Sequence, residues 1–268
     1  MVKKLLALLV LALMLSSCQN NDFEDEYVVR LPDLPPETTT ESATAGTTVS
    51  QPTVVKELQD KIICIDPGHG IFTQGYKEPI GPGATETKAA FVSGTSGAYQ
   101  TEAEFNLKTA YLLKQMLEDK GATVHMTRTD EKATLSNVGR AEFANGLGCD
   151  MVVRIHADGS ENTSVRGISV LIPGENQYLY DTDILTRSEN AGQKVLDALI
   201  KSTGADNKGL IKRYDLTGFN WTKVPCILVE CGFMSNPEDD MLLADEAYRT
   251  LLAQGITDGL IEYYMTVQ

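Results

Sequence analysis

From Lys61 onward, short β-branched runs alternate with longer amphipathic stretches, and this alternation is compatible with few folds. Runs of Val, Ile and Thr favour strands, whereas apolar residues that recur every three or four positions favour helices. The strand-like runs lie at residues 62–66, 122–127, 151–156, 167–172 and 226–230. The helix-like stretches lie at residues 101–120, 137–147, 185–203 and 246–264. This order predicts a single α/β domain at residues 58–268, with helices packed on a sheet.

The N-terminus has the features of an export signal. Two lysines precede an apolar run from Leu5 to Leu15, which is too short to span a bilayer permanently. The segment Leu15-Ser16-Ser17-Cys18 resembles the lipobox of bacterial lipoproteins, in which the cysteine is lipidated. We therefore expect a signal peptide at 1–17 and a membrane anchor at Cys18, with the domain outside the cytoplasm. The alternative is an ordinary cleaved signal with an incidental cysteine.

Residues 18–57 have a linker composition, with acidic residues, a proline-rich patch and a threonine-rich stretch. Such a segment buries little apolar surface, so we expect it to stay extended and mobile. It would serve as a spacer between membrane and domain, or be an unselective tail. The remaining ~210 residues suffice for a single domain with a sizeable core.

The charge balance excludes some partners. The chain has 37 acidic and 23 basic residues, a formal net charge of −14. A surface this acidic repels polyanions, which argues against binding to nucleic acid or to anionic lipid.

Four cysteines follow Cys18, at positions 64, 149, 226 and 231. They show no CxxC spacing, and three lie within or beside apolar runs, which favours buried hydrophobic roles over metal binding. A disulfide remains open, because exported proteins meet oxidising conditions.

Three apolar runs end in polar residues that would be costly to bury without a role. These ends contain His69, His156 and Glu230, and the first two are two of the chain's three histidines. In open α/β sheets, ligands and catalytic groups gather at the carboxyl ends of strands. Neutral imidazole is a common metal ligand, and the glycines beside His69 permit a tight turn around an ion.

A catalytic zinc site commonly has three protein ligands, so two histidines need a partner such as a carboxylate. Thr101 is a plausible N-cap, and Glu104 is placed to complete a capping box, which leaves Glu102 free at the first helical position. From these residues alone, Glu102 is either the third ligand or a solvated charge that favours the start of the helix.

Several motifs occur in a fixed order along the domain and carry a family resemblance. They are Ile65–Gly70, Glu78–Gly83, Glu102 with Asn106-Leu107, Thr127-Arg128, Arg140 with Ala144-Asn145, Arg154–Ser160, Asn220-Trp221 with Pro225, Val229-Glu230, Gly232-Phe233 and Ser235–Pro237. In this pattern the chain from Lys61 to its end resembles the zinc amidase family called amidase 3. The resemblance implies a twisted mixed sheet of about six strands with helices on both faces.

The resemblance also implies the chemistry. His69, Glu102 and His156 match the family's zinc ligands, and Glu230 matches its catalytic glutamate. The implied reaction is hydrolysis of the amide between N-acetylmuramic acid and L-alanine in peptidoglycan. Without the resemblance, Glu230 is nearly as well explained as an ion-pair partner of a base such as Lys223.

The chain departs from the family pattern at two positions near the site. Asp158 stands where the family usually has Asn, and Arg154 stands where Ser is common. Neither change removes a ligand or the catalytic glutamate, so we expect an active enzyme.

Four other residues in these motifs are expected to have structural roles or roles at the site. Asp66 would hydrogen-bond a ligand histidine or close the strand-end turn, while Arg128 and Arg140 would brace loops. Trp221 would stack on a sugar or pack beside Phe219.

His125 is expected to lie outside the site, which already has three ligands. The long loop at residues 71–100 is expected to form a wall of the cleft.

The sequence also allows three rival functions. A zinc carboxypeptidase would share the ligands but release terminal D-alanine. A wall-binding lipoprotein with a degenerate site would cleave nothing. A glycosidase using Asp66 and Glu230 would create reducing ends, but it leaves two histidines unexplained.

Overall fold

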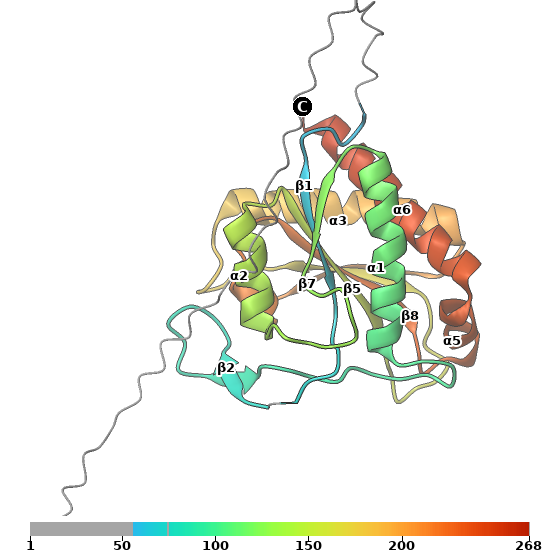
Figure 1. Cartoon of the computed structure of the whole chain (residues 1–268), viewed down its shortest axis with the longest axis horizontal. Coiled ribbons are helices and arrows are strands. Elements are labelled where there is room, and N and C mark those ends of the chain that lie inside the picture. Colours follow the sequence, from blue (N-terminus) through green and yellow to red (C-terminus); the bar gives the residue numbers. More distant parts are fainter. Residues whose placement is uncertain (1–55, 74, 268) are drawn as a thin grey trace, which may run out of the picture. The chain divides into compact units, whose positions relative to one another are not determined.

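The computed structural model describes residues 56–73 and 75–267 (Figure 1). The predicted signal peptide at 1–17, the anchor at Cys18 and all but the last two residues of the linker at 18–57 lie outside the described residues.

Within the described residues, the central sheet has six strands in the order β4-β1-β5-β8-β6-β7. In chain order, they are β1 (Ile62–Pro67), β4 (Thr123–Met126), β5 (Met151–Asp158), β6 (Ile168–Pro173), β7 (Asn207–Arg213) and β8 (Cys226–Phe233). Strands β4, β1, β5 and β8 run parallel, β6 is antiparallel to β8, and β7 is parallel to β6. The predicted mixed sheet of about six strands is confirmed.

Helices cover both faces of this sheet, as predicted. They are α1 (Glu102–Asp119), α2 (Asn137–Leu147), α3 (Thr182–Thr203), α4 (Thr217–Asn220), α5 (Pro237–Ala244) and α6 (Glu246–Thr266). Helix α6 packs against α1, α3 and α5, whereas α2 packs against α4. Among the described residues, none of these helices has the length and apolar character needed to cross a bilayer.

The two faces of the sheet have separate cores, because side chains alternate along each strand. On β1, Ile63 and Ile65 join the cluster formed with α1, α3 and α6, whereas Cys64 joins the cluster that contains Phe143 of α2. Burial on both faces explains why β1 reads as an unbroken apolar run.

The described cysteines also lie in these two cores. Their four thiols are buried and free, so the prediction of buried hydrophobic roles is confirmed for this part of the chain.

Some elements were not predicted. The edge strand β7 carries Asn, Lys and Gly and exposes much of its length, so its apolar signal is weak. Within the loop at 71–100, β2 (Lys77–Pro79) and β3 (Thr87–Ala89) form a short antiparallel pair. Helix α5 was also missed, although Asn236 at its N-cap and Pro237 at its first position are recognised start signals.

The parallel part of the sheet positions the site. Because β1, β5 and β8 are adjacent and parallel, their carboxyl ends meet at one edge. His69 follows the end of β1, and His156 of β5 lies directly opposite Glu230 of β8. Glu102 begins α1.

Candidate metal centre

His69 lies in a strained turn that follows β1. Its φ of 59° falls in the left-handed region, which costs energy for a residue with a side chain. Arg140 donates to the carbonyls of Pro67 and His69, at 2.7 Å each, and Arg128 donates to the carbonyl of Gly68 at 2.9 Å. The predicted bracing roles of the two arginines are confirmed.

The turn also makes room for the second histidine. A Cβ added at Gly68 would lie 2.2 Å from Cε1 of His156, so only glycine allows the ring to approach. The rings of His69 and His156 meet edge to face, with centroids 4.8 Å apart.

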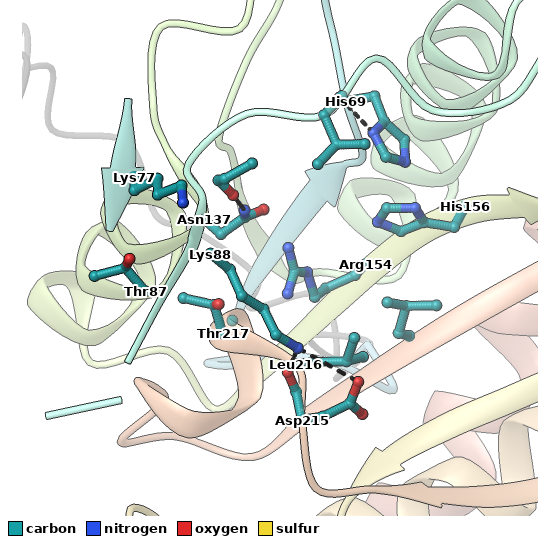
Figure 2. Close-up of a pocket in the computed structure, with 14 residues that line it drawn as sticks. His69, Lys77, Thr87, Lys88, Asn137, Arg154, His156, Asp215, Leu216 and Thr217 are labelled. Carbon is teal, nitrogen blue, oxygen red and sulfur yellow. Dashed lines mark hydrogen bonds and ion pairs between the residues drawn. The ribbon is translucent and has the colours of Figure 1, made fainter. Parts of the chain in front are cut away.

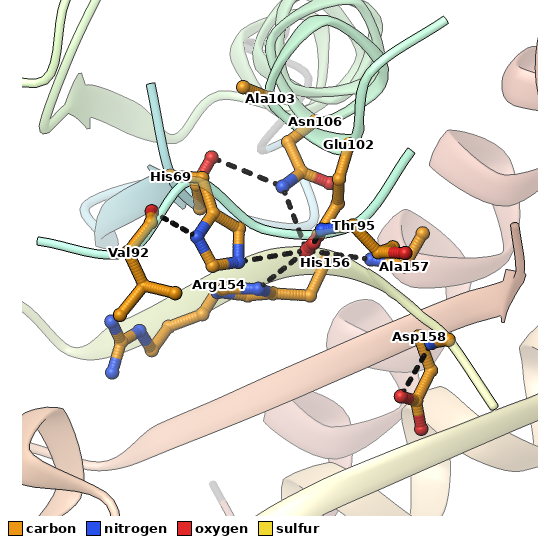
Figure 3. A network of polar contacts seen from close by, with 12 residues as sticks. His69, Val92, Thr95, Glu102, Ala103, Asn106, Arg154, His156, Ala157 and Asp158 are labelled. Carbon is orange, nitrogen blue, oxygen red and sulfur yellow. Dashed lines mark hydrogen bonds and ion pairs between the residues drawn. The ribbon is translucent and has the colours of Figure 1, made fainter. Parts of the chain in front are cut away.

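Glu102 lies between the two rings (Figure 3). The predicted capping box is present: Thr101 accepts from the amide of Glu104, and Glu104 accepts from the amide of Thr101. Glu102 is therefore free of the cap, and it is only 3% exposed, so the reading as a solvated charge is wrong. Its Oε2 accepts from the amide of Thr95 at 2.9 Å.

The other oxygen of this carboxylate, Oε1, lies 3.1 Å from Nε2 of His69 and 2.9 Å from Nδ1 of His156. Burial raises the pKa of Glu102, but the contacts with His156 and His69 outweigh it and hold the pKa well below its ordinary value. The carboxylate is therefore ionised, the form that a metal ligand needs.

The hydrogen bond of His69 indicates which ring nitrogen faces Glu102 as an acceptor. Nδ1 of His69 is 2.7 Å from the carbonyl oxygen of Val92, which can only accept, so Nδ1 carries the proton. In the neutral ring, Nε2 then directs a lone pair at an oxygen of Glu102. A proton or a metal ion between Nε2 and Oε1 removes the repulsion between their lone pairs. A proton there gives the ion pair that lowers the pKa of Glu102, and a metal ion would take the same place.

The donor set therefore fits a metal ion. One atom each from His69, Glu102 and His156 lies within 4.8 Å of the others. Two imidazole nitrogens and a carboxylate oxygen are ligands that suit zinc and similar divalent ions.

Glu230 lies beside this cluster with an unused oxygen. Its Oε2 is buried and has no hydrogen-bond partner among the described residues. Burial raises the pKa of Glu230 well above its ordinary value, and the charges of Glu102 and Asp158 add to the effect. Arg213 and Arg154 lower this pKa only in part. Among the described residues, Glu230 forms no ion pair with a lysine or arginine and its Oε2 has no partner, so the alternative that Glu230 pairs with Lys223 is wrong.

Two large cavities and a small one of about 20 Å³ adjoin the cluster, and His69 and His156 line all three. The two large cavities differ in charge. One, of about 600 Å³, is acidic and is lined by Glu102, Glu230 and Asp158. The other, of about 570 Å³, is lined by Arg154 and by two lysines of the β2–β3 pair, which sequence reasoning did not single out (Figure 2).

The loop at residues 71–100 reaches both cavities, with Val92 in the basic cavity and Thr95 in the acidic one. The expectation that this loop forms part of the cleft wall is confirmed.

Asp66 has a different role from those expected. It is 1% exposed and accepts hydrogen bonds from Thr127, Arg140 and Arg154, at 2.5, 2.6 and 2.8 Å. Both readings from the sequence are therefore wrong, because these donors are neither a histidine nor an amide of the turn. The carboxylate instead joins side chains that follow β4 and that lie on α2 and β5.

Trp221 caps α4, and its ring nitrogen donates to the carbonyl of Pro79 at 3.0 Å. His125 is on β4, and it lines neither cavity.

Comparison with known families agrees with this geometry. The family model described as Amidase_3, N-acetylmuramoyl-L-alanine amidase, matches residues 63–262. The chain belongs to the Amidase_3 family. Residues 69, 102, 156 and 230 of this Amidase_3 domain all fall within the matched range.

Individual relatives give the same result. The domain is 32% identical over 209 residues to the probable cell wall amidase LytH of Staphylococcus aureus. The matched region is 77% of this chain and 60% of that relative. The crystal structure of the N-acetylmuramyl-L-alanine amidase Ami1 from Mycobacterium smegmatis is similar to this domain, with a TM-score of 0.69 and 29% sequence identity. The match covers 78% of this chain and 99% of the Ami1 chain. Ami1 from Mycobacterium abscessus is also 29% identical, with a TM-score of 0.68, over 76% and 99% of the two chains.

Proposed function

We propose that this Amidase_3 domain is a zinc-dependent cell-wall amidase, which hydrolyses the amide between N-acetylmuramic acid and L-alanine in peptidoglycan. The observation that carries the proposal is the pair of ring nitrogens directed at one oxygen of Glu102, beside the unpaired oxygen of Glu230. Membership of the family supports the identity of the substrate.

His69, Glu102 and His156 would hold the ion through Nε2, Oε1 and Nδ1. A bound zinc ion would polarise the carbonyl under attack and lower the pKa of a water from about 15.7 toward about 7. The carbonyl of Val92 keeps the proton of His69 on Nδ1, and the amide of Thr95 holds the far oxygen of Glu102. Both ligands are therefore oriented before substrate arrives.

Glu230 is the general base in this proposal. Its ionised carboxylate takes a proton from the attacking water as the new C–O bond forms. The protonated carboxyl then gives this proton to the nitrogen of L-alanine as the C–N bond breaks. The products are a free amino group and a lactyl carboxylic acid, which loses the second proton of the water to solvent and becomes a carboxylate. A raised pKa suits this cycle, because the group must hold the proton between the two steps.

We also propose that the protein is a lipoprotein held at the outer face of a membrane through Cys18. The lipobox-like segment Leu15-Ser16-Ser17-Cys18 supports this location. Similarity to a probable cell wall amidase supports action outside the cytoplasm.

The test is digestion of purified peptidoglycan, followed by mass spectrometry of the fragments. We expect new amino groups on L-alanine, loss of cleavage with a chelator, and recovery when zinc is added back. Release of terminal D-alanine would instead support a carboxypeptidase, and new reducing ends would support a glycosidase. Cleavage that persists at full rate in metal-free enzyme would contradict the zinc proposal.

A further inference from the structure

Arg154 lies on the wall of the basic cavity and has no role in the proposed reaction. Its side chain is buried, with the residue 6% exposed, yet it is in the lining of this 570 Å³ cavity (Figure 2). A cavity of this volume is in the range of small-molecule sites and can hold more than one amino-acid residue.

The guanidinium is fixed from two sides. Nε donates to Oδ2 of Asp66 at 2.8 Å, and a Cβ added at Gly218 of α4 would lie 1.7 Å from Nη1. The absence of a side chain at Gly218 therefore makes room for the planar group. Among the described residues, Nη1 and Nη2 of Arg154 have no acceptor, which leaves two parallel donors for a ligand.

This region has an excess of positive charge. Asp66 is the shared carboxylate of both Arg140 and Arg154, so one guanidinium charge is uncompensated. Lys77 and Lys88 line the same cavity, and of these Lys88 is paired with Asp215.

The acidic cavity, which His69 and His156 also line, carries Glu102, Asp158, Glu161 and Glu230. A substrate carboxylate would therefore be repelled from that cavity and attracted to the basic one.

The spacing along β5 relates Arg154 to the cleaved bond. Arg154 and His156 are two residues apart, so they share a face and are separated by about 7 Å along the strand. In an extended stem peptide, the α-carboxylate of the residue after L-alanine also lies roughly 7 Å from the cleaved carbonyl. When that residue is a γ-linked D-glutamate, this is the first free acid beyond the amide.

We propose that Arg154 is a specificity residue that binds the α-carboxylate of the second stem residue through Nη1 and Nη2. The inference rests on the proposed amidase function and extends it to the choice of stem peptide. Arginine makes two parallel hydrogen bonds with a carboxylate, whereas a carboxamide offers one acceptor and places its NH₂ group against a donor. Peptides amidated at this position are therefore poor substrates.

The test uses two muramoyl tripeptides, each with its C-terminus amidated. They differ only in whether the second residue carries an α-carboxylate or an α-carboxamide. With the zinc-loaded full chain, we expect kcat/KM to favour the carboxylate by about tenfold to a hundredfold. Titration calorimetry of both tripeptides with the Glu230→Gln variant should show the same preference in Kd.

Variants separate recognition from folding. Arg154→Gln should bring the ratio of the two kcat/KM values close to one, and Arg154→Lys, which keeps the charge but loses the fork, should give an intermediate ratio. Arg249→Gln is the matched control, because Arg249 is also a buried arginine but donates to the carbonyls of Leu243 and Ala244 and does not line the basic cavity. It should leave the ratio of the two kcat/KM values unchanged.

The outcomes distinguish the two proposals. If the wild type cleaves neither tripeptide, the amidase function fails, and calorimetry still decides whether Arg154 prefers the carboxylate. Equal kcat/KM values and equal Kd values for the two peptides in the wild type would overturn the inference, whether or not Arg154→Gln folds. A preference that persists unchanged in Arg154→Lys and Arg154→Gln would overturn it as well.

Discussion

At His69, one backbone carbonyl decides which ring nitrogen is available to a metal. The carbonyl belongs to Val92, in the loop at residues 71–100, so the position of this loop affects the ligand as well as the cleft. The sequence predicted His69 as a ligand, but it did not show the partner. Backbone acceptors leave no trace in residue type, which is why this contact could be found only in three dimensions.

Glu230→Gln tests the base at the scale of one residue. The amide keeps the size of the side chain but cannot take a proton, so we expect kcat to fall by about a hundredfold or more while zinc stays bound. Glu161→Gln is the matched control, because Glu161 lines the same cavity but is exposed. Single-turnover kinetics and elemental analysis of both variants measure the two effects. Full activity in Glu230→Gln would end the assignment.

At the scale of elements, the end of β1 depends on the buried charge of Asp66. Burial raises the pKa of Asp66, but the charges of Arg140 and Arg154 outweigh it and hold the pKa far below its ordinary value. A lowered pKa in the folded state stabilises the protein above the unfolded value of about 3.9. This stability is lost as the pH falls through the folded pKa, so Asp66 keeps contributing in mildly acidic solution.

Asp66→Asn should lower the free energy of unfolding by about 3 to 5 kcal/mol at pH 7, because it leaves two guanidiniums without a carboxylate. The difference from wild type should shrink only in strongly acidic solution, where Asp66 itself takes a proton. Urea unfolding across pH measures it. Asp119→Asn, an exposed control at the end of α1, should change stability by less than about 0.5 kcal/mol.

Local signals predicted some elements and missed others. Helix α2 has the predicted bounds, because Ser136 caps its start and the left-handed Gly148 ends it. Strand β7 gave no such signal, since an edge strand needs few apolar residues. The cavity role of Arg154 could not be predicted, because it depends on Gly218, which the fold brings from a distant part of the chain.

For the whole domain, the metal is expected to add stability as well as activity. An ion that binds only the folded state adds about 2.7 kcal/mol when its free concentration is 100 times Kd, which raises the Tm of a domain this size by roughly 5 to 10 °C. Differential scanning fluorimetry with chelator and with added zinc measures the shift. His69→Ala should abolish the response, whereas His125→Ala, on β4, should retain it. An unchanged Tm at saturating zinc would count against the site.

The anchor can be tested in the intact cell. Cys18→Ser removes the proposed acceptor of lipid while leaving residues 58–268 intact. We expect the variant protein to leave the membrane fraction, while its purified form keeps wild-type activity on soluble fragments. Fractionation followed by immunoblotting measures the distribution. Equal membrane association of variant and wild type would show that the cysteine is not the anchor.

Because β6 runs antiparallel to β8, the connection between β5 and β6 can vary in length. Strand β5 ends, and the antiparallel β6 begins, at the same edge of the sheet, so the connection at residues 159–167 never has to cross a face. Its first residues line the acidic cavity. Insertions there would lengthen the rim of the cleft without moving either histidine, so related enzymes could acquire new preferences for wall polymers while the reaction centre stays fixed.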